Sequence, residues 1–250
     1  MLAFSSLLGN VEGQNIYRIW YDKPASYWEE ALPVGNGRIA AMVFGDPQLE
    51  QIQLNEETVS AGSPYQNYNE EAKTALPEMR RLIFEGKYEE AQNMAATKIL
   101  SQVGNEMPYQ TVGRLNIRYQ DHKKVNNYYR DLDISNAVAV ARYEVDGVEF
   151  TEETFASFTD QLVIRHIKAS KPGTINCELF FNTPMRDPKR SIYGKKGLRL
   201  EGITHGSRYF PGKVHYCADL DVKHKGGKVI TANDTLLSVQ GASELTLYIS

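Results

Sequence analysis

The chain has 250 residues, of which 42% are hydrophobic and 24% are charged, and its net charge at pH 7 is −3. This balance is typical of a globular protein, and it excludes a nucleic-acid-binding protein, because that class carries a strong excess of Lys and Arg. The sequence also predicts no membrane span, since no apolar stretch is long enough to cross a bilayer as a helix. A chain of this length folds as one large β domain or as two smaller domains.

Residues 1–13 contain a short apolar stretch followed by Gly9-Asn10-Val11-Glu12-Gly13. Val11 and Gly13 are small residues at the −3 and −1 positions of a candidate signal-peptidase cut before Gln14. We interpret residues 1–13 as the remnant of a secretion signal, which predicts an exported protein, periplasmic or extracellular. The alternative interpretation is a disordered tail without function.

The most distinctive stretch of the chain, residues 27–45, contains the turn sequence Gly35-Asn36-Gly37. These three residues tolerate positive φ angles, so the backbone can reverse direction tightly here. The apolar run at residues 39–44 is typical of a strand covered on both faces. We expect residues 27–38 to have a structural role, with Trp28 packed and with Gly35 or Gly37 at positive φ. Its structural signature comprises Trp28, Gly35, Asn36, Gly37 and Arg38.

The same glycines match a second pattern. Gly35-x-Gly37-x-x-Ala40 fits the loose dinucleotide-binding fingerprint, and Glu56 follows about twenty residues later, where a ribose-binding acid would lie. That fingerprint needs a strand before the glycines and a full helix after them. Pro33 weakens the strand because it lacks an amide donor, and Gly45-Asp46-Pro47 ends any helix after about two turns. A nucleotide-binding oxidoreductase is therefore the weakest of the functional alternatives.

Residues 74–100 are the part of the chain that predicts helices. Thr74 can cap a first helix with Pro77 in its first turn. An apolar stripe at helical spacing runs through residues 76–83, and Gly86 is a natural helix stop. The spacing recurs after Gly86, so the sequence predicts an αα-hairpin inserted among strands.

From Pro108 onward the sequence alternates as β-strands do, interrupted by short turn signals. The clearest signal is Asp146-Gly147, which predicts a type I′ hairpin with Val145 beside Val148. The alternation fails at Glu152-Glu153, where we expect a β-bulge. Short strands joined by Pro and Gly turns predict a mainly β, antiparallel sandwich.

Few residues of the chain suggest chemistry. No spacing of Cys or His is typical of a metal site, so we predict neither a metal nor a cofactor. Cys177 and Cys217 have opposite strand parities relative to their apolar neighbours, which predicts that the two thiols are not bonded to each other. Adjacent acids such as Glu29-Glu30 and Glu56-Glu57 point to opposite faces of a strand. Glycosidic chemistry instead needs two facing carboxyl groups, about 5 to 9 Å apart.

Several motifs occur in an order that resembles glycoside hydrolase family 95, the α-L-fucosidases. They are Trp28-Glu29-Glu30-Ala31-Leu32-Pro33-Val34-Gly35-Asn36-Gly37-Arg38, Gln53-Leu54-Asn55-Glu56-Glu57-Thr58, and the segments at 82–88, 129–133 and 155–157. The chain departs from the family pattern at Val59-Ser60-Ala61-Gly62, where members usually carry Trp-Ser-Gly-Gly. It departs again at Gly113-Arg114-Leu115, where members tend to have Gly-Asp-Leu.

The resemblance implies that residues 14–250 form the N-terminal super-sandwich, galactose-mutarotase-like, of a longer hydrolase. The last strand pattern, residues 245–249, has no terminator, which agrees with a chain cut from something longer. The family continues with a helical linker, a catalytic (α/α)6 barrel and a C-terminal β domain. The barrel removes terminal α-1,2-linked L-fucose, or in some members L-galactose, from glycans with inversion. Because the family's catalytic groups belong to the barrel, no catalytic residue is assigned here; the implied partners are that barrel and a fucosylated glycan.

Asn55 and Glu56 are the candidate residues for contact with the barrel or its cleft. They follow a predicted strand, residues 51–54, as a polar stretch, and loops at strand ends commonly carry function. The alternative for them is a solvated loop. The alternative for the whole chain is a free-standing carbohydrate-binding β-sandwich, which an exposed row of Trp or Tyr on one face would favour.

Overall fold

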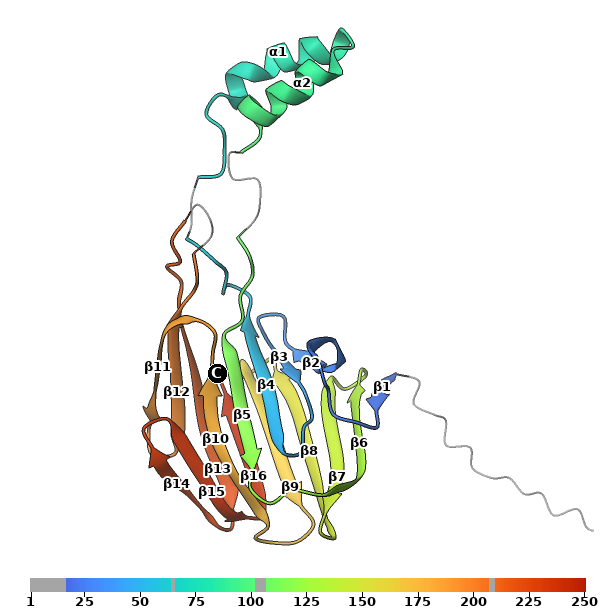
Figure 1. Cartoon of the computed structure of the whole chain (residues 1–250), viewed down its shortest axis with the longest axis vertical. Coiled ribbons are helices and arrows are strands. Elements are labelled where there is room, and N and C mark those ends of the chain that lie inside the picture. The colour runs from blue at the N-terminus through green and yellow to red at the C-terminus, as the bar shows by residue number, and fades with distance from the viewer. Residues whose placement is uncertain (1–16, 64–65, 102–106, 207–209) are drawn as a thin grey trace, which may run out of the picture.

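The structure is a computed structural model that describes residues 17–63, 66–101, 107–206 and 210–250. The interpretation of residues 1–13 as a secretion-signal remnant lies outside the described residues. Within them, two antiparallel sheets pack face to face (Figure 1), which confirms the predicted antiparallel sandwich.

Sheet A has nine strands in the described ranges. In spatial order they are β1 (Arg18–Tyr21), β6 (Val125–Asp133), β7 (Val138–Val145), β8 (Val148–Ser157), β9 (Leu162–Ala169), β16 (Glu244–Ile249), β13 (His215–Lys225), β12 (Gly197–Ile203) and β11 (Arg186–Tyr193). The strand that comes last in the sequence, β16, therefore lies inside this sheet, between β9 and β13.

Sheet B has seven strands in the described ranges. In spatial order they are β14 (Lys228–Asn233), β15 (Leu236–Ala242), β10 (Ile175–Asn182), β5 (Gly113–Tyr119), β4 (Leu49–Glu56), β3 (Ile39–Val43) and β2 (Leu32–Gly35). A short 3-10 helix, η1 (Trp28–Glu30), precedes β2.

The core lies between the two sheets, because every second residue of the central strands points inward. Ile52, Leu115 and Leu179 face it from sheet B, while Ile167 and Leu247 face it from sheet A, and all five are fully buried. Burial of one such side chain contributes about 1.5 to 3 kcal/mol relative to exposure.

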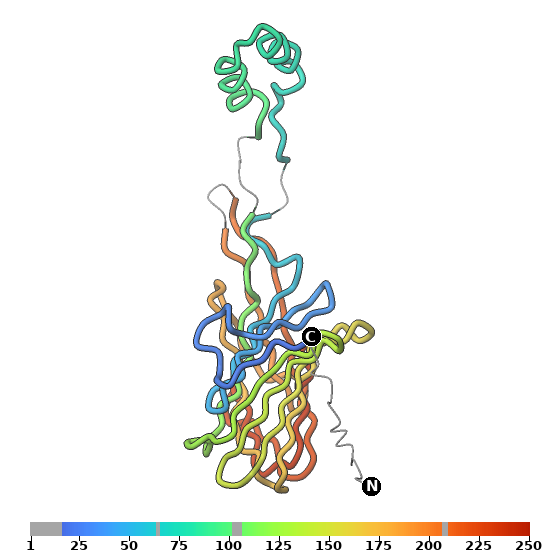
Figure 2. Tube along the Cα trace, turned by 90° about the vertical axis from the view of Figure 1, so that its right-hand side faces the viewer, coloured from blue at the N-terminus to red at the C-terminus, as the bar shows by residue number. Residues whose placement is uncertain are grey.

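The part of the chain in which the sequence pattern predicts helices contains α1 (Ala72–Phe84), α2 (Tyr88–Met94) and a short π-helical turn, η2 (Ala95–Ile99). The two helices lie beyond the end of the sandwich where β4 ends and β5 begins (Figures 1 and 2). Helix α1 starts before Thr74, so Pro77 lies in its interior rather than in its first turn. In the described part of the chain, no helix is long and apolar enough to cross a membrane.

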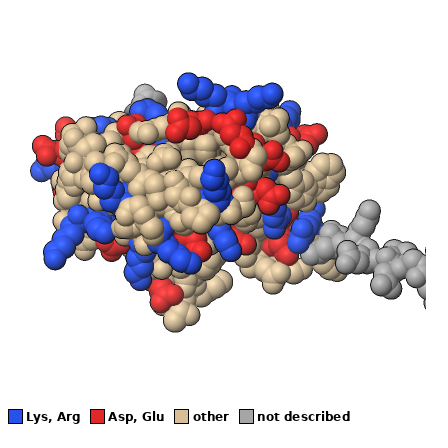
Figure 3. Space-filling view, turned by 90° about the horizontal axis from the view of Figure 1, so that it is seen from below, with Lys and Arg blue, Asp and Glu red and all other residues tan. Residues whose placement is uncertain are grey.

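The end of the sandwich opposite the helices carries charges of both signs, with neither dominant (Figure 3). Figure 3 looks at the end of the sandwich opposite the helices and shows basic and acidic side chains interspersed there. This distribution agrees with the low net charge and offers no basic field on that face.

The β7–β8 hairpin has the geometry that its turn sequence predicts. Asp146 and Gly147 have φ angles of 49° and 74°, as a type I′ turn requires, and Val145 pairs with Val148. The bulge expected at Glu152-Glu153 is wrong, because β7 and β8 pair without a register shift through Thr154. Glu152 instead points into the core.

Glu152 can occupy the core because Arg165 and two tyrosines surround it. Arg165 of β9 forms ion pairs with Glu152 of β8 and with Glu50 of β4, the latter at 2.9 Å, so one guanidinium joins sheet A to sheet B. The hydroxyls of Tyr119 and Tyr143 donate to Glu152. All three charged residues are buried. We call Glu50, Glu152 and Arg165 the buried triad.

The buried triad contains two carboxyl groups and one cation, and one of the two carboxyl groups has a raised pKa. Burial is the main cause that raises the pKa of Glu50 to about 7, and the Glu152 carboxylate adds to it, while Arg165 opposes the rise. The amides of Phe44 and Gly45 donate to Glu50 at 3.1 and 2.9 Å. Glu50 is therefore the group of the triad that takes up a proton near neutral pH.

We expect the stability of the fold to fall as pH rises from about 4.5 to 7, in part through Glu50. A carboxyl group whose pKa is higher in the folded than in the unfolded state stabilises the fold below its unfolded pKa, and this contribution is lost as pH rises through about 7. The contribution is at most roughly 3 kcal/mol. The free energy of unfolding, measured with urea at pH 5 and at pH 7.5, should differ more between the two pH values for the wild type than for Glu50→Gln. An equal difference in both proteins would contradict this assignment.

The Gly35-Asn36-Gly37 sequence forms the turn between β2 and β3, which pair antiparallel. Gly37 has a φ of 93°, which confirms the expectation of one glycine at positive φ. No helix follows these glycines, so the dinucleotide-binding alternative is wrong. The expectation that Trp28 is packed is also wrong, because 48% of Trp28 is exposed. The short helix η1 that carries Trp28 has no buried residue.

Replacement of Gly37 by Val should destabilise the protein by about 1 to 3 kcal/mol, because a β-branched residue at this φ is strained. A Cβ atom at Gly37 would meet no heavy atom within 4 Å, so steric contact does not add to the cost. Gly37→Asn is the matched control, since Asn tolerates positive φ better than other residues. Thermal unfolding of the wild type and the two variants measures their stabilities, and the Val variant should be the least stable. Equal melting temperatures of the Val and Asn variants would contradict the prediction.

Cys177 and Cys217 are both free, which confirms that they are not bonded to each other. Cys177 is buried in β10 of sheet B, whereas Cys217 is exposed on β13 of sheet A. Burial, together with the Asp219 carboxylate, raises the pKa of Cys217 to about 11, so little thiolate is present at neutral pH.

A thiol reagent should therefore label one group, Cys217, in the native protein and two groups after unfolding without reductant. The native reaction should speed up as pH rises toward 11, because the thiolate is the reacting form. Absorbance of the released chromophore, followed at a series of pH values, measures both the number of reactive thiols and the rate of the native reaction. Recovery of no thiol from the unfolded protein would contradict the structure.

Candidate functional site

The predicted candidate residues gather at the end of the sandwich from which the helices extend (Figure 1). Asn55 and Glu56 end β4, and the Asn36 turn lies beside them because β3 pairs with β4. Ser157 ends β8, and Ser250 follows β16. We call this region the β4 end of the sandwich.

Asn36 holds the β4 end together. Its Oδ1 accepts the amides of Arg38 and Ile39 at 3.1 and 2.9 Å, which closes the turn. Its Nδ2 donates to the carbonyl of Ser157 at 2.8 Å, so the turn of sheet B is tied to sheet A. A buried side chain with all of these partners has a structural role.

Glu56 is held by several partners. Its carboxylate lies 3.3 Å from Nε of Arg38 and accepts the amide and hydroxyl of Thr58 at 2.8 and 2.6 Å. The hydroxyl of Tyr109 donates to its carbonyl at 2.8 Å. Glu56 therefore positions the loop that follows β4 and is not poised as a free acid.

Asn55 lines a small cavity of about 140 Å³ that opens between the sheets at this end. The walls are mainly apolar and include Leu54, Val163 and Ile249. Asn55 Oδ1 and Gln161 Oε1, from two of the lining residues, are buried and lack a hydrogen-bond partner among the described residues. The volume suits a few waters or one side chain, and it is below the 300 Å³ or so at which ligand sites begin. The cavity therefore suits a group that brings a hydrogen-bond donor.

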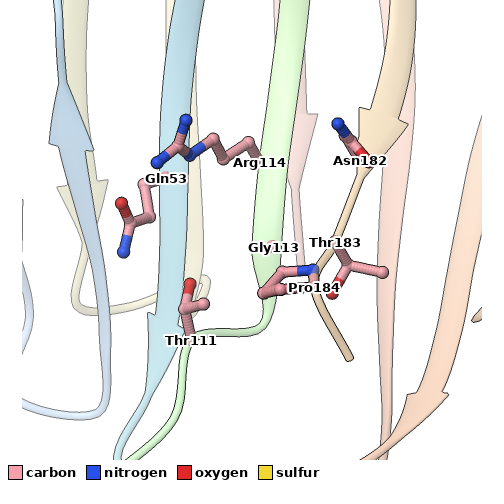
Figure 4. Close-up of a pocket in the computed structure, with 7 residues that line it drawn as sticks. All are labelled: Gln53, Thr111, Gly113, Arg114, Asn182, Thr183 and Pro184. Atoms are coloured by element: carbon pink, nitrogen blue, oxygen red, sulfur yellow. The ribbon is translucent and has the colours of Figure 1, made fainter. Parts of the chain in front are cut away.

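A second and larger concavity, about 300 Å³, lies on the outer face of sheet B (Figure 4). Gln53, Arg114 and Asn182 surround it from three adjacent strands, and Thr183 and Pro184 close one side. Nothing in the sequence separates these residues from other polar surface residues. Only the pairing of β4, β5 and β10 brings them together.

One pair of facing carboxylates among the described residues, from two different sheets, lies in a sealed position. Glu50 and Glu152 come from different sheets and share Arg165, but both are buried in the core. A glycan cannot reach them. Among the same residues, no group of three His, Cys, Asp or Glu side chains could hold a metal ion.

Comparisons with known proteins identify a family and several relatives of this chain. The family model described as "Glycosyl hydrolase family 65, N-terminal domain" matches residues 19–250. A curated relative, "Alpha-L-fucosidase 2" of Arabidopsis thaliana, is 37% identical over 96% of this chain and 31% of its own length. "Probable alpha-fucosidase A" of Aspergillus niger is 26% identical over 61% of this chain and 20% of its own length.

A solved structure, "Putative kojibiose phosphorylase from human microbiome", aligns with a TM-score of 0.47 and 9% identity, over 94% of this chain and 32% of that one. The chain spans less than a third of the length of the curated fucosidases just named. Since the family model covers nearly the whole described chain, the protein belongs to the family of glycosyl hydrolase family 65 N-terminal domains.

Proposed function

We propose that this chain is the non-catalytic N-terminal domain of an α-L-fucosidase-like hydrolase of the family 95 type. It braces a separate catalytic barrel and forms part of the wall of the substrate cleft. The observation that carries the proposal is the 37% identity to "Alpha-L-fucosidase 2", which spans 96% of this chain but only 31% of that protein.

The reaction of the parent protein is proposed to be inverting hydrolysis of terminal α-1,2-linked L-fucose or L-galactose, carried out by the barrel. Such a reaction needs an acid at the leaving oxygen and a base that activates water on the opposite face of the sugar. Glu50 and Glu152 are buried with Arg165, and Glu56 is held by Arg38 and Thr58, so none of these acids is available for it.

The β4 end is the proposed contact surface for the barrel. Asn55 and Gln161 each present a buried acceptor without a partner among the described residues, and a buried unpaired acceptor costs about 1 to 3 kcal/mol. A donor from a docked domain would remove that cost. Asn36 and Glu56 keep the neighbouring turns in place for such a contact.

The second candidate function is a free-standing carbohydrate-binding module, and one observation favours it. Trp20 is 61% exposed, and its ring stacks on that of Tyr129 at 6.2 Å between centroids. Exposed aromatic rings are common in sites that bind sugars and other ligands. Loss of glycan retention in Trp20→Ala, in a chain that remains folded, would support this module over a bracing domain.

We also propose that the parent is exported, on the basis of Val11 and Gly13 before Gln14. Mass spectrometry of the protein recovered from its native source should then find a mature chain that starts at Gln14. A chain that retains Met1 would contradict export by this signal.

The 250-residue chain alone should hydrolyse no α-1,2-fucosyl oligosaccharide, whereas the longer parent should. Each missing general acid or base typically accounts for about 10²- to 10⁴-fold in rate, and positioning of the substrate is lost as well. Release of free L-fucose, measured for both proteins at equal molar concentration, checks this. Turnover by the 250-residue chain that survives repurification and disappears in Glu56→Gln would contradict the proposal.

A further inference from the structure

The concavity on the outer face of sheet B is built from one row of polar residues. Gln53 pairs with Arg114 across β4 and β5, and Arg114 pairs with Asn182 across β5 and β10. Since neighbouring strands lie about 4.8 Å apart, Gln53 and Asn182 are separated by roughly 10 Å. In Figure 4 the Arg114 guanidinium lies toward Gln53, and the Asn182 amide lies on the opposite side. We call this row, with Thr111 and Thr183, the sheet B pocket.

Arg114 has unused donors in this pocket. One N–H donates to Gln51 Oε1 at 2.6 Å, and the guanidinium lies 5.6 Å from the centre of the Phe44 ring. In the described part of the chain it forms no ion pair with a carboxylate. Arg118 on the same strand and face differs, because it pairs with Glu178 at 3.2 Å and stacks on Phe180. Among the described residues, Arg114 is therefore a guanidinium without a counter-charge.

The other pocket residues provide neutral hydrogen-bonding groups. Within the described ranges the side chains of Gln53 and Asn182 have no hydrogen-bond partner, so each offers an amide donor and acceptor. The hydroxyl of Thr111 donates to the Leu54 carbonyl at 3.0 Å, which leaves its oxygen as an acceptor. Thr183 Oγ1 is used within the fold, because it donates to the Val112 carbonyl at 2.8 Å and accepts the Met185 amide at 3.1 Å. Of the residues that the structure describes, no Asp or Glu lines the pocket.

We propose that the sheet B pocket binds one sugar unit that carries a carboxylate, a hexuronate. The volume of about 300 Å³ lies at the lower end of the range for ligand sites, as a single sugar requires. The guanidinium of Arg114 takes the carboxylate, for which its geometry and charge are suited. The amides of Gln53 and Asn182 take hydroxyl groups on either side of the ring. The site does not depend on the fucosidase proposal, because this chain provides all of it.

The pocket also lies close to the β4 end. Gln53 precedes Asn55 by two residues on β4, so the Cα atoms of the two residues are about 7 Å apart. A saccharide seated in the pocket can thus extend toward the β4 end of the sandwich. An acidic sugar bound there would direct the protein to glycans that contain uronate.

The test is a titration of the 250-residue chain with methyl β-D-glucuronide, methyl β-D-glucoside or sodium acetate, followed by amide chemical shifts. For one sugar unit we expect a Kd on the order of 1 mM. The glucuronide should bind at least 10-fold tighter than the glucoside or acetate and should shift the signals of Gln53, Arg114 and Asn182. The glucoside lacks the carboxylate and acetate lacks the ring, so the comparison separates the two parts of the ligand.

Variants locate the site. Arg114→Gln should lower the affinity for the glucuronide at least 10-fold, to that for the glucoside, and Asn182→Ala should lower it several-fold. Arg118→Gln is the matched control, because it removes the same charge from the same strand outside the pocket and should leave the affinity unchanged. Unchanged amide spectra away from the substitution confirm that each variant is folded. Equal binding of acetate and glucuronide, absence of binding at 20 times the expected Kd, or equal losses in the Arg114 and Arg118 variants would each overturn the proposal.

Discussion

The relative position of the two sheets depends on Arg165. Its guanidinium is buried between them and meets a carboxylate from each side, Glu152 of sheet A and Glu50 of sheet B. An ion pair buried this deeply contributes little net stability, because desolvation offsets the attraction, but it is costly to break. A slip of either sheet by one residue would leave charges buried without partners. The triad therefore acts mainly to select one register between the sheets.

The sequence predicts the local features of this fold well and the nonlocal ones poorly. The Asp146-Gly147 hairpin depends on two residues with positive φ, and short-range rules capture it. Glu152 is different, because its inward position is stable only when Arg165 and Tyr119 are present, and these lie 13 and 33 residues away. When only the local sequence is considered, an acid at a core-facing position suggests that the alternation of inward and outward residues has shifted by one. The expected bulge was the simplest explanation that the local pattern allowed.

The candidate sites also differ in whether local sequence is enough to predict them. Asn55 and Glu56 could be selected from the sequence because they follow a strand as a polar loop, and the structure brings them together with Asn36 at one end of the sandwich. Arg114 and Asn182 could not, since they lie 68 positions apart and become neighbours only through the pairing of β5 with β10. In a sandwich, residues on one face come from strands that are distant in the chain. A single sequence does not specify which strands become neighbours.

The position of β16 has a consequence for biosynthesis. Sheet A consists of a block from β1 to β9 and a block from β13 to β11, and β16 is hydrogen-bonded to both. Among the strands of the described ranges, β16 follows the others in the sequence, so it emerges from the ribosome after them. Until then β9 and β13 each have an unpaired edge, which can pair with another chain. Closure of sheet A therefore depends on this one strand, and until it pairs, two sheet edges stay open at once.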